Sequence, residues 1–317
     1  MITRRDFTRL ASIAAGSLFV SPSQELQEKR TPESENPATI TSGFVQRAGA
    51  EIYYEHSGSG PAIVFAHGLG GNHLSWWQQV PFFSPHYACV TFAHRGFSPS
   101  HIAFGSVDPA LFEEDLRALV DHLKLAEVRL VAQSMGGWAC LNFALRHPRR
   151  VRALVMASTG GAVDLNTLDV DDRKRVESWS ASHGGMSAEL RTRGIHPAAG
   201  ERMARENPAL EFLYREIDRM SSSLDKEALR ARLQAARTLP AADLKRLIIP
   251  VLFISGTEDV VFPPPAAAAL ANLVPGAKLE SVPEAGHSVY FQRPDIFNRL
   301  VSNFFEMHQG PAASSPS

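Results

Sequence analysis

The sequence has little cysteine, almost no net charge and no long apolar run, and each shortage excludes a class of protein. Among 317 residues there are two cysteines, Cys89 and Cys140, both inside apolar stretches. We therefore expect small buried side chains there rather than a disulfide or a metal site. The formal net charge of −1 offers no basic surface for nucleic acid or for an anionic membrane. No run of about 18 consecutive apolar residues occurs, so no membrane-spanning helix is expected.

Short apolar runs alternate with stretches long enough for helices through most of the chain. Hydrophobic residues make up 44% of the sequence and charged residues 21%, as in ordinary globular proteins. Several runs are apolar at every position, which is typical of parallel strands covered by helices on both faces. Residues 114–123 have apolar side chains at helical spacing. We therefore predict an α/β fold with a mostly parallel, doubly wound sheet, whose strands are 62–66, 87–93, 128–132, 151–157, 248–255 and 278–282, with 52–55 as an antiparallel edge strand.

One interval, residues 160–247, shows no strand pattern. It is rich in Arg, Glu and Ala with helical periodicity, for example at 210–220 and 226–237. Because a loop of this length is rare inside a compact domain, we predict a helical cap inserted after the sixth strand. The expected core then consists of residues 41–159 and 248–309.

The N-terminal 40 residues differ from the rest. Residues 3–7, TRRDF, followed by a modest apolar region at 10–20, resemble a twin-arginine export signal, and residues 21–42 are polar and proline-rich like a linker. We predict that 1–40 form a signal and linker, which implies the twin-arginine export machinery as a partner and a periplasmic or secreted protein. If this segment is only a basic N-terminus, the protein is cytoplasmic. Residues 310–317 are expected to be a disordered tail.

The string AQSMG at residues 132–136 lies between an apolar run and a helical stretch. A serine in a sharp strand-to-helix turn has a strained backbone, and small residues two positions away on each side, Ala132 and Gly136, relieve the crowding. The hydroxyl of Ser134 would then project from the end of the sheet, near the backbone N–H groups of a helix N-terminus. The alternative is an ordinary helix N-cap serine.

A glycine-rich turn, HGLGGN at residues 67–72, follows an earlier strand. The N–H of Leu69 in this turn can aim at the same point as the N–H of Met135, and two convergent donors would form an oxyanion hole. A plain glycine turn is the alternative.

Two later strands are each followed by a titratable residue. Asp259 ends the string SGTED, and His287 ends PEAGH. A carboxylate at the end of a strand can fix the tautomer of a histidine, and a histidine there can act as general base for Ser134. Glu258 competes with Asp259, although we interpret it as a solvated neighbour.

The chain order Ser134, Asp259, His287, together with the serine turn and the HG turn, resembles the α/β-hydrolase family from about residue 43 to residue 306. The resemblance implies a sheet of the family's eight-stranded type with a helical cap over it.

Two further strings carry the same resemblance. They are WQQV at 77–80 and HRGFSPS at 94–100, which is similar to the family's D-x-R-G-x-G-x-S turn. Ala93 replaces an acid there and Pro99 replaces a small residue, and both changes bear on the rim of the pocket.

The family resemblance implies a serine hydrolase that needs no cofactor and no metal. Ser134 would attack a carbonyl carbon, His287 would take its proton and pass it to the leaving group, and water would release the acyl-enzyme. A serine at this position argues against the haloalkane dehalogenases and epoxide hydrolases of the family, which use a carboxylate. We favour a small-molecule ester or lactone as substrate.

Other activities stay open at this point. The string SMGG at 134–137 also occurs in C–C bond hydrolases that cleave ring-fission products, although Ser288 follows His287 where those enzymes often have an aromatic residue. A haloperoxidase-like side activity and a non-catalytic binding protein are the remaining alternatives, and the oligomeric state is undetermined.

The substrate pocket is expected to take side chains from both the core and the cap. Each of these residues could equally belong to the hydrophobic core. The candidates are His67, His94, Trp138 and Trp179, with Met186, Phe212 and Tyr214 as further apolar walls from the cap.

Overall fold

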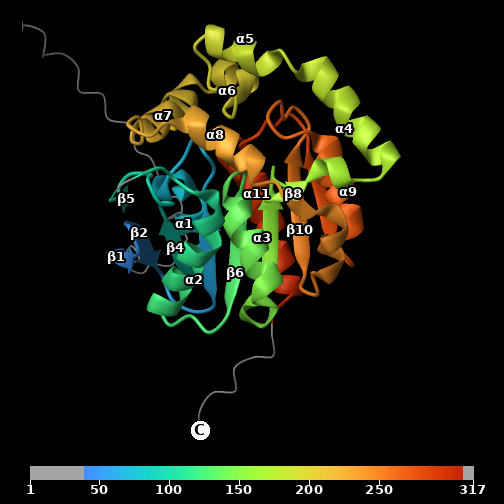
Figure 1. Ribbon diagram of the computed structural model, residues 1–317. Coiled ribbons are helices and arrows are strands. Elements are labelled where there is room, and N and C mark those ends of the chain that lie inside the picture. Colours follow the sequence, from blue (N-terminus) through green and yellow to red (C-terminus); the bar gives the residue numbers. More distant parts are fainter. Residues whose placement is uncertain (1–38, 104, 310–317) are drawn as a thin grey trace, which may run out of the picture. The chain divides into compact units, whose positions relative to one another are not determined.

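A mostly parallel sheet organises the chain in the computed structural model, which describes residues 39–103 and 105–309 (Figure 1). The strand order is β1-β2-β4-β3-β6-β7-β10-β11, and β5 pairs with β2 to complete a nine-stranded sheet. β2 runs antiparallel to its neighbours, whereas all pairs from β4 to β11 are parallel. The predicted α/β class is therefore confirmed. The strands are β1 (Thr41–Arg47), β2 (Ala50–Ser57), β3 (Ala62–Ala66), β4 (Ala88–Phe92), β5 (His101–Ile102), β6 (Val128–Gln133), β7 (Val151–Ala157), β10 (Val251–Gly256) and β11 (Lys278–Val282).

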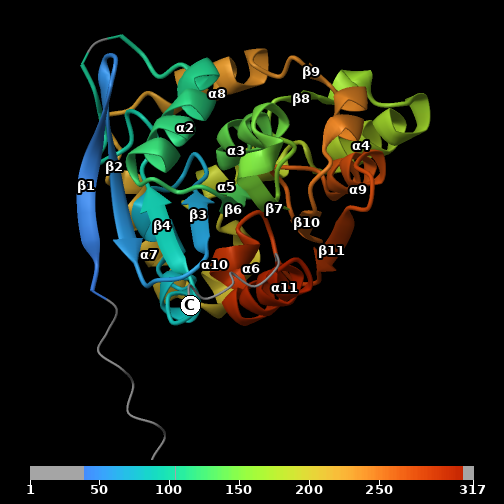
Figure 2. The same cartoon turned by 90° about the horizontal axis from the view of Figure 1, so that it is seen from below.

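The sheet has a separate hydrophobic core on each face (Figure 2). Side chains of a strand alternate between faces, so Val64 of β3 belongs to the core that α2, α3 and α9 cover, while Ile63 and Phe65 belong to the core that α1, α10 and α11 cover. Both faces of the central strands are thus buried, which explains their continuous apolar runs. These helices are α1 (Val80–Phe83), α2 (Phe112–His122), α3 (Gly136–Arg146), α9 (Pro264–Leu273), α10 (Val289–Gln292) and α11 (Pro294–Met307).

Five helices lie between β7 and β10, and Figure 1 shows them beyond one end of the sheet. We call residues 160–247 the cap. The expectation that this interval holds no strand was wrong, because β8 (Val163–Asp164) pairs in parallel with β9 (Leu239–Pro240). Strands of two residues are too short to produce a periodic pattern. The cap helices are α4 (Val170–His183), α5 (Met186–Thr192), α6 (Gly200–Glu206), α7 (Pro208–Arg219) and α8 (Lys226–Ala235).

The predictions for the cysteines, the edge strands and the two termini have different outcomes. Cys89 and Cys140 are free and buried, one in each core, as expected. β1 was not predicted, because this edge strand is largely exposed and lacks a continuous apolar run. The export signal and most of the linker, like the C-terminal tail, fall outside the described residues. Within residues 39–103 and 105–309, no helix combines the length and apolarity needed to cross a membrane.

The start of α3 packs unusually closely against β3. A Cβ atom added at Gly136 would lie 2.2 Å from the carbonyl oxygen of Ala66. Backbone atoms cannot move aside as a flexible side chain can, so only glycine allows the helix to begin at this point. The position of α3 relative to the sheet therefore depends on Gly136.

We predict that Gly136→Ala lowers the free energy of unfolding by about 1–3 kcal/mol or more, because the added methyl group overlaps the Ala66 carbonyl. Chemical denaturation of parent and variant measures this loss. Gly185→Ala is the matched control, since a Cβ atom there would meet nothing within 4 Å. Equal losses in the two variants would contradict the packing argument.

Candidate active site

Ser134 occupies the turn between β6 and α3 in a left-handed backbone conformation, with φ of +49°. Its N–H donates to the Ala157 carbonyl of β7 at 3.1 Å, and its carbonyl accepts from Gly137 N–H at 2.9 Å and from Thr159 Oγ1 at 2.6 Å. Such a conformation costs about 1–3 kcal/mol for a non-glycine residue and persists only when the surroundings hold it. Here three hydrogen bonds do so.

His287, which follows β11, and Asp259, which follows β10, are hydrogen-bonded to each other. Nδ1 of His287 lies 3.0 Å from Oδ1 and 2.9 Å from Oδ2 of Asp259. The aspartate is fully buried, and its Oδ1 also accepts from the N–H groups of Val261 and Phe262, each at 2.8 Å. An ionised carboxylate can only accept hydrogen bonds, so Nδ1 of His287 donates and Nε2 is left as an acceptor.

Glu258, the competing carboxylate, points elsewhere. It forms an ion pair with Arg202 of the cap, with Oε1 2.6 Å from Nη2, and this pairing lowers the pKa of Glu258. The histidine therefore has one carboxylate partner, Asp259.

The N–H groups of Leu69 and Met135 are candidates for holding an oxyanion. Both residues line the same cavity as Ser134. Among the residues that the structure describes, neither N–H has a hydrogen-bond partner. The HG turn also approaches the serine closely, because a Cβ atom added at Gly68 would lie 3.0 Å from Cβ of Ser134.

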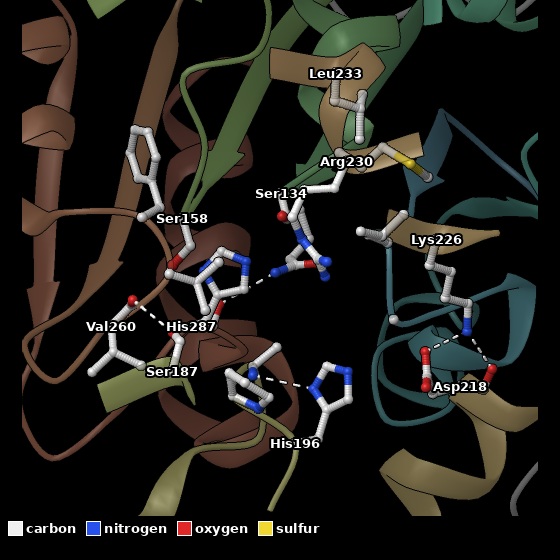
Figure 3. Close-up of a pocket in the computed structure, with 18 of the residues that line it drawn as sticks. Ser134, Ser158, Ser187, His196, Asp218, Lys226, Arg230, Leu233, Val260 and His287 are labelled. Carbon is white, nitrogen blue, oxygen red and sulfur yellow. Dashed lines mark hydrogen bonds and ion pairs between the residues drawn. The ribbon is translucent and has the colours of Figure 1, made fainter. Parts of the chain in front are cut away.

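A cavity of about 670 Å³ brings these residues together. Figure 3 shows Ser134 and His287 facing this cavity from the core, with residues of the cap around them. Its lining also contains Trp138, one helical turn after Ser134, and Tyr214 of α7. The size is in the range of small-molecule sites.

His67 and His94 lie in the core and not on the cavity lining, which corrects their interpretation as pocket residues. Nδ1 of His67 is 2.7 Å from the Gly68 carbonyl, and its Nε2 accepts from the N–H of His94 at 2.9 Å. Burial lowers the pKa of His67 to about 3, and it lowers that of His94 well below the ordinary value. Both rings are neutral and support the turn beneath the site.

The aromatic and methionine candidates for the pocket wall lie in different places. Trp138 and Tyr214 line the cavity, whereas Trp179 and Met186 line a second cavity of about 300 Å³ in the cap. Phe212 is 56% exposed. Helical periodicity places a residue on a face of its helix but does not determine what that face meets, so the sequence could not separate these cases.

His196 is a cavity residue that sequence reasoning missed. Its Nδ1 accepts from the N–H of Ala198 at 3.1 Å, so its Nε2 carries the proton. Burial lowers the pKa of His196 to about 4, with Asp218 opposing the shift and Lys226 adding to it. No motif surrounds this residue in the sequence. Only the fold of the cap brings it to the cavity.

The donor set gives no metal centre. Within the described part of the chain, no group of three or more His, Cys, Asp or Glu side chains is arranged to hold a metal ion. The thiols are also poor ligands, because burial raises the pKa of Cys89 to about 12.

Comparisons with known proteins agree with this geometry. A family model described as alpha/beta hydrolase fold matches residues 61–294. A relative from Mycobacterium tuberculosis that carries the name non-heme bromoperoxidase BpoC is 30% identical, over 80% of this chain and 97% of its own. The 3-oxoadipate enol-lactonase 2 of Acinetobacter baylyi is 26% identical, over 76% of this chain and 87% of its own. The structure of Est816, described as an N-acyl homoserine lactone degrading enzyme, superposes with a TM-score of 0.67 and 25% identity, covering 83% of this chain and all of its own.

We predict acid destabilisation that depends on His67. In the folded chain its pKa is about 3, whereas in the unfolded chain it is near 6.5, so only the unfolded chain binds a proton in between. Stability from this residue is therefore complete above about pH 6.5 and falls by up to about 2 kcal/mol by about pH 5. Urea denaturation at the two pH values measures the loss.

His67→Gln should reduce this pH-dependent loss, since Gln binds no proton. Comparing the two pH values within each variant cancels any constant effect of the substitution. His101→Gln is the control, because that side chain is 62% exposed. An unchanged loss in His67→Gln would show that His67 is not held neutral by burial.

Proposed function

The chain belongs to the α/β-hydrolase family and is a hydrolytic enzyme, and we propose that it cleaves a carboxylic ester or lactone through an acyl-enzyme on Ser134. The observation that carries this proposal is the strained serine turn facing the same cavity as a histidine bound to a buried carboxylate. The name of the enol-lactonase relative and the description of Est816 as a lactone-degrading enzyme support a lactone as substrate.

In the proposed mechanism His287 is the general base and acid. Because its Nδ1 donates to Asp259, its Nε2 can take the proton of Ser134 during attack on the carbonyl carbon. The imidazolium that forms is stabilised by the carboxylate and passes the proton to the leaving oxygen. Water then attacks the acyl-enzyme, again with His287 as base, and frees the acid and the serine.

The N–H groups of Leu69 and Met135 are proposed to stabilise the tetrahedral intermediate. Donors without partners in the folded chain need no rearrangement to bind a developing negative charge, and each such donor is worth about 3–4 kcal/mol in the transition state. The cap would close the cavity over the substrate. From the sequence we also propose export by the twin-arginine route, a core of residues 41–159 and 248–309, and a cap of residues 160–247.

Ser134→Ala tests the proposal directly. Hydrolysis of p-nitrophenyl acetate and butyrate should fall by roughly 10⁴-fold or more, because the nucleophile is lost. Ser158→Ala is the matched control, since Ser158 lines the same cavity at the end of β7 and should leave the rate within a few fold.

Three outcomes are distinguishable. Equal activity in the parent and Ser134→Ala would refute the nucleophile. If the parent reacts at Ser134 with a fluorophosphonate probe but hydrolyses neither ester, a C–C bond of a ring-fission product becomes the favoured substrate. A protein that does neither would contradict the acyl-enzyme mechanism on Ser134.

A further inference from the structure

The cap contributes mostly cationic side chains to the cavity. Six cations line it, against two carboxylates, those of Asp218 and Glu227. Three of the cations, Lys226, Arg230 and Arg237, lie with Leu233 on one face of α8 and the residues just after it, and Figure 3 shows Lys226 and Arg230 on this side of the cavity. The spacing repeats every three or four residues, so one helical face meets the cavity. The six cations are Arg191, Arg215, Arg219, Lys226, Arg230 and Arg237.

Four of these cations are neutralised by carboxylates of the cap itself. Each pair lies within one helix or between neighbouring helices. The pairs are Arg215 with Glu211, Arg219 with Glu216, Arg230 with Glu227, and Lys226 with Asp218. Within the described residues, Arg191 and Arg237 form no ion pair. Arg191 is exposed, so water can solvate its charge.

Arg237 differs because it is partly buried. Its guanidinium lies 4.9 Å from the ring centroid of Trp138, and its one hydrogen bond in the described chain is a 3.4 Å contact to the Val163 carbonyl. Burial lowers the pKa of Arg237, with Asp164 opposing the shift. Within the described residues, Asp164 forms no direct ion pair with Arg237, and its Oδ1 accepts two hydrogen bonds from Asn166.

Arg237 lines the same cavity as Ser134, the proposed nucleophile. Trp138, on which its guanidinium packs, is buried in α3 one helical turn after Ser134, and both residues line the cavity with Arg237. A group bound by this guanidinium would therefore be part of the molecule that Ser134 attacks.

A partly desolvated guanidinium without a direct ion-pair partner becomes more favourable when a ligand supplies the opposite charge. The planar guanidinium matches a carboxylate in two parallel hydrogen bonds, which an ammonium cannot form. Arg191, the other cation of the lining without an ion pair in the described chain, adds a second positive charge to the cavity wall.

We propose that the substrate carries a carboxylate group that Arg237 binds, so that the enzyme cleaves anionic esters or lactones. This inference rests on the proposed hydrolase function. It adds a specificity-determining residue that acts by binding a part of the substrate remote from the scissile bond.

The test compares two esters of equal acyl length, the mono-p-nitrophenyl ester of glutaric acid and p-nitrophenyl pentanoate. The parent should prefer the glutarate ester in kcat/KM. Arg237→Gln should reduce this preference about tenfold or more, because a charged hydrogen-bonding partner is lost. Comparing the two esters within each variant cancels any general effect of the substitution on folding or turnover. Arg237→Lys should retain an intermediate preference, because it keeps the charge without the planar fork.

Arg152→Gln is the matched control for loss of one positive charge. It lies near the start of β7, whereas the cavity lies beyond the strand's end at Ala157, so its ester preference should equal that of the parent. If the parent shows no preference for the glutarate ester, or if Arg237→Gln keeps it, the inference is wrong while the hydrolase function stands.

A binding measurement covers the case in which neither ester is hydrolysed. Calorimetric titration with glutarate, the acid released from the first ester, should then show binding to the parent and at least about tenfold weaker binding to Arg237→Gln. That result would support the carboxylate site and count against the proposed cleavage of esters. Equal binding to both proteins, or none to the parent, would overturn the inference.

Discussion

The close approach of three parallel strands at the turn holding Ser134 is the constraint on which the rest of the site depends. Gly136 lets α3 begin against the Ala66 carbonyl of β3, and the Ser134 N–H is fixed by the Ala157 carbonyl of β7. The left-handed conformation of the serine is thus held by the hydrogen bond to β7 and by the position of α3 against β3. Because side chains beneath it fill both cores, the turn cannot relax without disturbing the sheet.

The side chains of Asp259 and His67, near this turn, are buried and hydrogen-bonded before any substrate arrives. Asp259 is fully buried and accepts hydrogen bonds from three donors, and the one from Nδ1 orients the ring of His287. His67 lies in the core beneath the turn, and burial lowers its pKa so that the ring is neutral. It therefore adds no positive charge near His287 when His287 takes a proton. The cap supplies the opposite wall, where most charges are internally paired and Arg237 is available to a ligand.

The sequence predicted what depends on short strings and missed what depends on packing. Ser134, Asp259 and His287 each follow a predicted strand. The carboxyl ends of parallel strands lie at one edge of the sheet, so the sequence predicts that these three residues lie close together. His67 and His94 lie equally near those strings, yet they point into the core. His196 and Arg237 belong to the cap, where local patterning indicates helices but not which face meets the cavity. Strands β8 and β9 were not predicted for a related reason. Each has only two residues and is recognised as a strand only through its pairing with the other.

The central claim is that Ser134 becomes acylated during turnover, and trapping that intermediate tests it most directly. The parent would be mixed with p-nitrophenyl acetate, quenched in acid within the first turnovers, digested and analysed by mass spectrometry. The account predicts one acetyl group on the peptide containing Ser134, absent after the substrate is exhausted. Rapid hydrolysis with the acetyl group on another residue, or with no covalent adduct under conditions where p-nitrophenol release shows a burst, would contradict it.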